Sequence, residues 1–237
     1  MEPRMDQRLA HARVGVEQVD AGLRSHMLSV YNYMGLALAL TGLTAFVTAS
    51  TPFMVNLIFG TPLQWVVMLA PLGFIFFLGA KVRTMSVSAA QLTFWAFAIT
   101  MGLSMASIFL VFTGTSIARV FFITAATFGA MSLYGYTTQR DLSKFGSFLF
   151  MGLIGIIIAM VVNIFIGSSA QQFAISVIGV LVFTGLTAWD SQRIKEEYST
   201  LDGADLLTKG AIMGALSLYL NFINLFMMLL HLFGNRE

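Results

Sequence analysis

Asp190 is the residue whose position in this chain points most clearly to chemistry. It directly follows an apolar run of helix length, residues 175–189, and it is one of only two carboxylates between residues 21 and 195. The other, Asp141, lies in a short polar break with basic neighbours. An ionisable group near hydrocarbon is costly to hold, so Asp190 is a candidate functional residue. The alternative is that it marks a helix end in the lipid headgroup layer.

A second polar feature lies in the last apolar run. Ser217, Asn221 and Asn224 recur at intervals of four and three residues, which places them on one face of a helix. Asn221 follows Gly210 by eleven residues, or about 16 Å of helix. Asp190 lies near the end of its own run, so it meets Asn221 only if the last helix begins before Gly210 or a water-filled inlet reaches down.

The composition is that of an integral membrane protein. Hydrophobic residues make up 57% of the 237 residues and charged residues only 10%, with 22 Phe. This is more apolar surface than one soluble core buries. Cys is absent, which excludes thiolate chemistry and disulfides. The net charge of +2 is small, so nucleic acid is not expected as a partner.

Catalytic motifs are not found. His11, His26 and His231 are isolated from one another, and neither His-Glu-x-x-His nor Gly-x-Ser-x-Gly occurs. Intramembrane proteolysis with paired aspartates needs two membrane carboxylates, and Asp190 supplies one. We therefore do not expect an enzyme.

Seven apolar runs are long enough to cross a bilayer as helices. The runs are continuous rather than alternating, which favours helices over a barrel. We predict an all-α integral membrane bundle of seven transmembrane helices over 27–237, preceded by a cytoplasmic arm, 1–26. The runs are approximately 27–49, 63–80, 87–112, 116–136, 145–167, 171–189 and 210–233. Two pairs of small residues have the spacing of close helix packing, Gly210 with Gly214 and Ala125 with Gly129.

The basic residues predict the orientation. Eleven of the thirteen Lys and Arg residues fall in the arm and in the second, fourth and sixth connections, against Arg119 and Arg236 on the other side. The positive-inside bias then places the N-terminus in the cytoplasm. The compact loops and the lack of an organellar targeting segment favour a bacterial inner membrane.

Two segments resemble a known family. The string from Trp189 to Lys195, Trp-Asp-Ser-Gln-Arg-Ile-Lys, is similar to the end of the sixth helix of the transmembrane Bax-inhibitor-motif family. The string from Ala215 to Phe226, Ala-Leu-Ser-Leu-Tyr-Leu-Asn-Phe-Ile-Asn-Leu-Phe, resembles its seventh-helix signature. The resemblance extends over nearly the whole chain in span number, loop length and orientation.

The resemblance implies a bundle with the seventh helix at its centre, acting as a pH-sensitive calcium leak and, in animals, as a suppressor of cell death. Conducting relatives pair an Asp on helix six with an Asp on helix seven, and a basic residue at the end of helix two cooperates with the pair. Asp190 corresponds to the first Asp, and Lys81 or Arg83 to the basic residue. Calcium would be a permeant or transiently bound ion rather than a cofactor, held by Asp190 and by the carbonyl oxygen of Asn221. Ser217 and Asn224 would line its path.

Asn221 departs from the family pattern, because it stands where conducting relatives have the second Asp. Two carboxylates in contact do not both ionise readily and share a proton near neutral pH, whereas an Asp beside an amide lacks this repulsion. We expect Asp190 to be ionised at neutral pH if Lys81, Arg83 or Arg193 lies near it. Gating around neutrality should then be less steep.

A role without ion permeation is the main alternative. Some bacterial relatives of this family modulate a membrane-anchored ATP-dependent protease, and such a protein would act in a stress or cell-death response. The arm and the connection from Ser191 to Thr208 would then supply the docking surface.

Overall fold

The computed structural model describes residues 3–199, 201 and 203–236, with side chains from Ala21 onward. The described residues form nine helices and no β-strand, apart from an isolated bridge between Phe112 and Arg236. The helices are α1 (Pro3–Ala49), α2 (Pro52–Phe59), α3 (Leu63–Lys81), α4 (Val87–Met105), α5 (Ile108–Val111), α6 (Gly114–Thr137), α7 (Ser143–Ile166), α8 (Ser169–Tyr198) and α9 (Ala204–Phe233).

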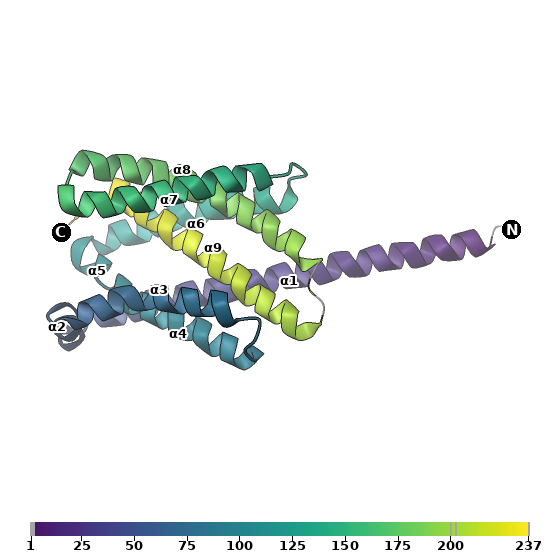
Figure 1. The fold of residues 1–237 in the computed structure, drawn as a ribbon, viewed down its shortest axis with the longest axis horizontal. Helices are drawn as coiled ribbons and strands as arrows, with labels where there is room; N and C mark the ends of the chain where they lie inside the picture. The colour runs from purple at the N-terminus through teal and green to yellow at the C-terminus, as the bar shows by residue number, and fades with distance from the viewer. Residues whose placement is uncertain (1–2, 200, 202, 237) are drawn as a thin grey trace.

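Seven segments are long and apolar enough to cross a membrane, which confirms the all-α membrane bundle (Figure 1). The third of them consists of α4 and α5, separated by a break at Ala106 and Ser107. The segments are Ala21–Ala49, Leu63–Lys81, Val87–Val111, Gly114–Thr137, Ser143–Ile166, Ser169–Tyr198 and Ala204–Phe233.

The connection before the last span is shorter than expected, and this is the main correction. The sequence predicted a loop from Ser191 to Thr208, but α8 continues to Tyr198 and α9 begins at Ala204. The charged residues of this region favour solvent without breaking a helix, so polarity alone misplaced both ends. Asp190 therefore lies eight residues inside α8 rather than at a helix end.

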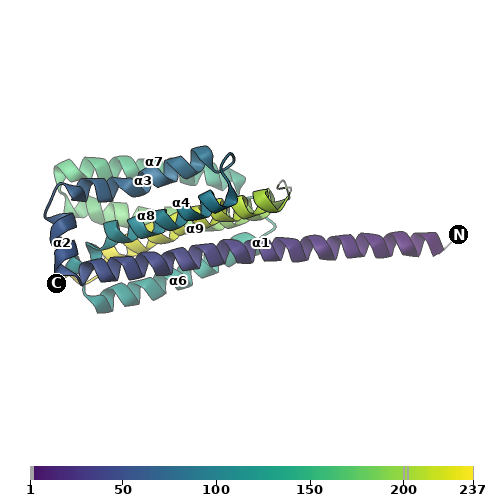
Figure 2. The same cartoon turned by 90° about the horizontal axis from the view of Figure 1, so that it is seen from below.

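The arm and the first span form one continuous helix. α1 contains 47 residues, or about 70 Å of helix, and its first part projects well beyond the other helices (Figures 1 and 2). The outer connection between residues 51 and 61 also contains a helix that was not predicted, α2, with Pro52 at its first position. Proline is well tolerated there because its missing N–H has no partner in the first turn.

Hydroxyl residues set several helix starts. The side chains of Ser86, Thr113 and Ser168 each accept a backbone N–H three residues on, at the beginning of α4, α6 and α8. This satisfies one of the free N–H groups that every helix start presents. α7 ends at Gly167, whose φ of 67° is a left-handed conformation that favours glycine.

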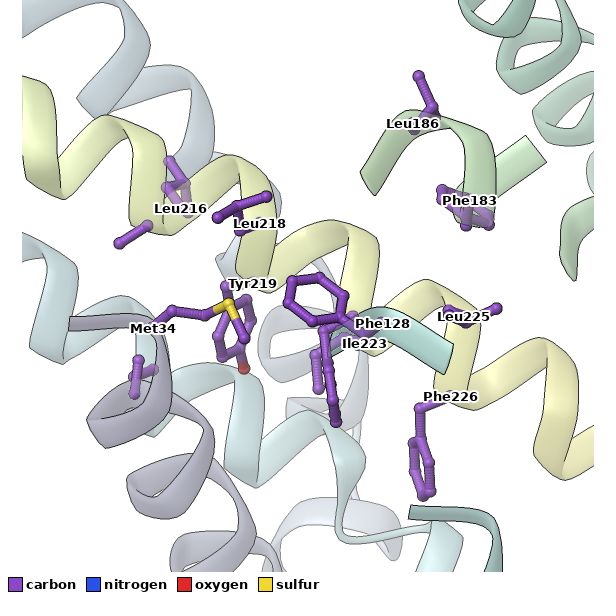
Figure 3. Close-up of a cluster of buried hydrophobic side chains, with 14 of the residues drawn as sticks. Met34, Phe128, Phe183, Leu186, Leu216, Leu218, Tyr219, Ile223, Leu225 and Phe226 are labelled. Carbon is purple, nitrogen blue, oxygen red and sulfur yellow. The ribbon is translucent and has the colours of Figure 1, made fainter. Parts of the chain in front are cut away.

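α9 is the central helix, as the resemblance implied. In its most apolar stretch 72% of residues are buried, against 6% to 44% in the other six spans. It packs against α8, α1, α6 and α4. Figure 3 shows Tyr219 and Ile223 of α9 among side chains from α1, α6 and α8. The other helices can expose apolar side chains because lipid covers them.

Glycines bring neighbouring helices close to α8. A Cβ on Gly135 of α6 would collide with the backbone carbonyl of Ala188, and one on Gly146 of α7 would collide with the Trp189 ring. Gly210 and Gly214 also serve close packing, against Leu201 and Ile194. A Cβ on Gly129 would meet nothing within 4 Å, so the predicted packing role of Gly129 is wrong.

The two ends of the bundle differ in charge. We call the end that carries the α3–α4, α6–α7 and α8–α9 connections the basic end, because these connections and their flanks hold seven of the cations, and α1 projects from it (Figure 1). At the opposite end the Thr113 N–H donates to the Asn235 carbonyl at 3.0 Å. Arg119 donates to the Phe233 carbonyl at 2.8 Å, where a cation also suits the end of the helix dipole of α9.

Candidate functional site

Asp190 and Asn221 are in direct contact at the interface of α8 and α9. The Asn221 Nδ2 donates to Asp190 Oδ2 at 2.7 Å, and each residue is only 6% exposed. We expected this contact only if α9 began before Gly210 or a water-filled inlet reached down. The first condition holds, because α9 begins at Ala204. Both α8 and α9 extend further toward the basic end than predicted, so Asp190 lies deeper in the bundle and level with Asn221.

Arg193 is the cation beside Asp190. Its Nη2 lies 2.7 Å from Asp190 Oδ1 in an ion pair one helical turn along α8, and the same nitrogen donates to Ser217 Oγ at 3.1 Å. The guanidinium also stacks over the Trp189 ring, 4.7 Å from its centroid. We call Asp190, Arg193, Ser217 and Asn221 the Asp190 cluster.

The cluster is buried on one side and open on the other. The side chain of Asp190 is 8% exposed, whereas that of Arg193 is 34% exposed. Glu197 Oε1 lies 3.5 Å from Arg193 Nε, with its own side chain 60% exposed. Arg193 therefore lies between a buried carboxylate and one that is open to solvent at the basic end.

Polar contacts fix α8 on both sides of the cluster. Gln192 accepts from the Leu142 N–H and donates to the Arg140 carbonyl, both at 2.8 Å, which ties α8 to the α6–α7 connection. Ser191 shares a 2.8 Å hydrogen bond with Ser132 of α6, which shares one of 2.6 Å with Tyr31 of α1. Because the hydroxyls of Ser132 and Ser191 are buried and hydrogen-bonded to each other, these contacts hold α8 in a defined position.

Other predicted site residues do not join the cluster. Asn224 donates to the Leu220 carbonyl of its own helix at 2.8 Å. Lys81 is exposed at the end of α3, and the Arg83 carbonyl accepts a long 3.5 Å contact from Lys209. Over the part of the chain that the structure describes, Arg193 is the cation within ion-pair distance of Asp190.

The two carboxylates that the sequence set apart have opposite environments. Asp141 is exposed in the α6–α7 connection, and its Oδ1 accepts the Ser143 N–H at 2.8 Å. Hydrogen bonds from Ser143 hold the pKa of Asp141 below its ordinary value. Asp141 is thus a solvated turn residue, while Asp190 is the buried one.

Some contacts of the site were not predicted. The Ser217–Arg193 hydrogen bond was missed, although the three-residue spacing of Asp190 and Arg193 in a helix indicates that the two side chains meet. The Tyr219 hydroxyl bonds to Thr41 at 2.7 Å, and Thr41 donates to the Ala98 carbonyl at 2.8 Å. This second contact ties α9 to α1 and α4, and no sequence pattern pointed to it.

The cluster offers one carboxylate and two neutral polar side chains to a cation. Calcium prefers oxygen ligands of this kind. Among the described residues, no group of three His, Cys, Asp or Glu side chains comes close enough to hold a metal ion. Both Asp190 oxygens already face donors, so another cation would replace the Arg193 guanidinium there.

Comparisons with known proteins extend over nearly the whole chain. Residues 23–237 match the family model described as "Inhibitor of apoptosis-promoting Bax1". The chain is 50% identical to an uncharacterized protein of Rickettsia prowazekii over 218 residues, 92% of each chain. It is 44% identical to the inner membrane protein YbhL of Escherichia coli over 225 residues, 94% of this chain and 96% of that one. With seven membrane-spanning helices and a central last helix, the chain belongs to the Bax inhibitor family.

Proposed function

We propose that this protein is a calcium leak of a bacterial inner membrane, with its N-terminus in the cytoplasm, gated by Asp190. The observation that carries the proposal is the buried carboxylate of Asp190 at the central helix, ion-paired with Arg193 at 2.7 Å. A charge held inside a membrane bundle is expensive, and such residues usually lie on ion or proton pathways.

Arg193 would act as the closing cation. Its guanidinium occupies the position beside Asp190 Oδ1 that a permeating cation would need. Its 34% exposure and its contact with Glu197 allow Arg193 to move toward solvent while it keeps a carboxylate partner. In the open form calcium would replace it, with Asp190, Ser217 and the Asn221 carbonyl oxygen as ligands.

The described arrangement would be the closed form. Beyond the cluster, α9 presents a run of buried apolar residues toward the opposite end, among them Leu225, Phe226 and Met228. Phe222 packs against Phe121 and Phe128 with ring centroids 5.5 Å apart in both pairs. Permeation would require α9 to shift against α6 so that these rings part.

A pocket at the basic end would be the entrance. It has a volume of about 370 Å³, and Arg83, Glu197 and Lys209 line it. Glu197 connects it to Arg193. The basic position that the resemblance assigns to Lys81 or Arg83 would then act on the gate through Glu197 rather than on Asp190 directly.

Reconstitution tests the proposal. Purified protein in liposomes with an internal calcium indicator should show calcium entry above empty liposomes, and the entry should be blocked by lanthanum, a trivalent cation that competes for oxygen ligands. A folded, inserted protein that gives the same signal as empty liposomes contradicts the leak.

One observation favours the alternative, an interaction role. α1 projects beyond the bundle as a helix long enough to reach a large cytoplasmic partner such as a membrane-anchored ATP-dependent protease (Figure 2). Removing residues 2–20 should then abolish co-purification of the protease, while the seven spans stay intact. Retention of the protease would exclude this part of α1 as its docking surface.

A further inference from the structure

A groove between α1 and α6 plays no part in the proposed leak. It has a volume of about 610 Å³ and lies away from the Asp190 cluster. Both helices pack on α9, and Tyr31 of α1 and Ser132 of α6, which both line the groove, share a hydrogen bond. The groove is lined by Arg24, Met27, Leu28, Tyr31, Phe128, Gly129, Ser132, Leu133 and Tyr136. We call it the α1–α6 groove.

The inner part of the groove suits a hydrocarbon chain. Phe128, Leu133 and Met27 make its walls apolar, and Gly129 leaves room because it has no side chain. The polar floor is already satisfied, since the hydroxyls of Tyr31 and Ser132 bond each other at 2.6 Å. From Tyr136 to Phe128 the groove follows α6 for about 12 Å, which matches part of an acyl chain rather than a compact polar ligand.

The outer part of the groove suits an anionic headgroup. Arg24 lines it at the basic end of the bundle, and its planar guanidinium can bind a phosphate with two parallel hydrogen bonds. Lys195 lies close by, with its amine donating to the Tyr136 carbonyl at 3.0 Å and 5.4 Å from the Tyr136 ring. Among the nine lining residues there is one cation and no carboxylate.

We propose that the α1–α6 groove binds one anionic phospholipid of the bilayer, with its phosphate at Arg24 and an acyl chain over Gly129. Charge complementarity selects this occupant, because basic pockets between membrane helices at the cytoplasmic side recognise anionic headgroups. The volume falls within the range of about 300–1,000 Å³ that is typical of ligand sites. The inference does not depend on ion conduction.

Native mass spectrometry of the purified full-length chain tests the proposal, with phosphatidylglycerol and phosphatidylcholine of identical acyl chains as probes. Phosphatidylglycerol should bind in a 1:1 ratio and more tightly than phosphatidylcholine. Arg24→Gln should lower the affinity for phosphatidylglycerol by about fivefold, since one cation near the membrane surface contributes about 1 kcal/mol to binding. Lys144→Gln, at the same end but outside the groove, should change nothing.

Gly129→Leu tests the acyl-chain part. A Cβ at this position meets nothing within 4 Å, so leucine should extend into the groove while the fold remains. It should abolish 1:1 retention of phosphatidylglycerol. Gly155→Leu is the matched control, because Gly155 is exposed on α7 with equally open space around its Cβ, and this variant should bind as wild type does.

Three results would overturn the proposal. The first is equal binding of both lipids, and the second is a Gly129→Leu protein that is monodisperse and stable yet keeps its phosphatidylglycerol. The third is a wild-type spectrum that shows a dimer without bound lipid, together with a monomer for Gly129→Leu. The groove would then hold a second copy of the chain.

Discussion

At the scale of single residues, the Asp190 cluster is built to hold a charge in the membrane. Asp190 has a cation on one oxygen and an amide N–H on the other, and Arg193 also contacts Ser217 and Glu197. Removing one partner of a buried ion pair is more damaging than removing both, because the remaining charge is left without compensation. Substitutions here should therefore change ion flux and stability in ways that depend on which partner is removed.

Asn221→Asp should make calcium flux more dependent on pH. The new carboxylate would lie where the Asn221 Nδ2 now lies, 2.7 Å from Asp190 Oδ2, so the two would share a proton. At low pH the pair carries one negative charge and at high pH two, so its attraction for calcium rises with pH. Flux into proteoliposomes between pH 6 and 8 measures this. A curve that overlays that of the wild type would contradict the role of Asn221.

Arg193→Gln should raise calcium flux at neutral pH. The glutamine keeps a donor for Ser217 but removes the cation that competes with calcium for Asp190. Two unit charges about 4 Å apart interact by about 4 kcal/mol at an effective dielectric constant of 20, and the 34% exposure of Arg193 reduces the value for this pair. An increase of about tenfold would fit the reduced value. Lys144→Gln at the same end is the control, and an unchanged or lower flux in Arg193→Gln would show that Arg193 does not close the path.

At the scale of helices, packing around α8 depends on small residues. Gly135 brings the backbones of α6 and α8 together at Ala188, next to the cluster, whereas Gly129 on the same helix faces open space. Backbone cannot move aside as a flexible side chain does, so the two glycines should respond oppositely to the same substitution.

Gly135→Ala should lower the free energy of unfolding by about 1–3 kcal/mol through overpacking. Gly129→Ala should raise it by up to about 0.5–1 kcal/mol, because alanine is the better helix former. Unfolding in mixed micelles of increasing SDS fraction compares the two. Equal effects would mean that the close approach at Ala188 is not needed for stability.

The number and type of the membrane spans could be predicted from the sequence, most of their boundaries followed from the apolar runs, and the resemblance implied the central position of the last span. Continuous apolar runs identify membrane helices, and five of the seven first boundaries were within about three residues of those observed. The end of α8 and the start of α9 were missed because charged residues such as Glu196, Glu197 and Asp205 suit both helix and loop. α2 was missed because its eight residues begin with a proline that also suits a turn.

Only part of the candidate site could be predicted from the sequence. Asp190, Asn221 and Ser217 were found because polar residues in an apolar run are conspicuous. Lys81, Arg83 and Arg193 were all candidates for the cation near Asp190, the first two from the resemblance, and the structure shows that Arg193, three residues along the same helix, takes this position. Contacts between distant helices, such as that of Thr41 with Tyr219, leave no periodic pattern in the chain.

At the scale of the whole molecule, the charge asymmetry of the two ends predicts the orientation in the membrane. The chain has no Cys, so single cysteines report their side without background. Asn56 in α2 and Gln139 in the α6–α7 connection are both exposed and lie at opposite ends of the bundle, so each can be replaced by cysteine. In intact cells a membrane-impermeant maleimide should label Asn56→Cys and leave Gln139→Cys unlabelled. The reverse pattern would place the N-terminus outside.

The most direct measurement is calcium flux into proteoliposomes for the wild type and Asp190→Asn across pH 6 to 8, with Asp141→Asn as the control carboxylate. The wild type should conduct with only a shallow pH dependence, and Asp190→Asn should lose about tenfold or more of the flux, because the attraction of the buried carboxylate for the ion is removed. Asp141→Asn should match the wild type. A flux that Asp190→Asn leaves unchanged, in correctly folded and inserted protein, would contradict gating by Asp190.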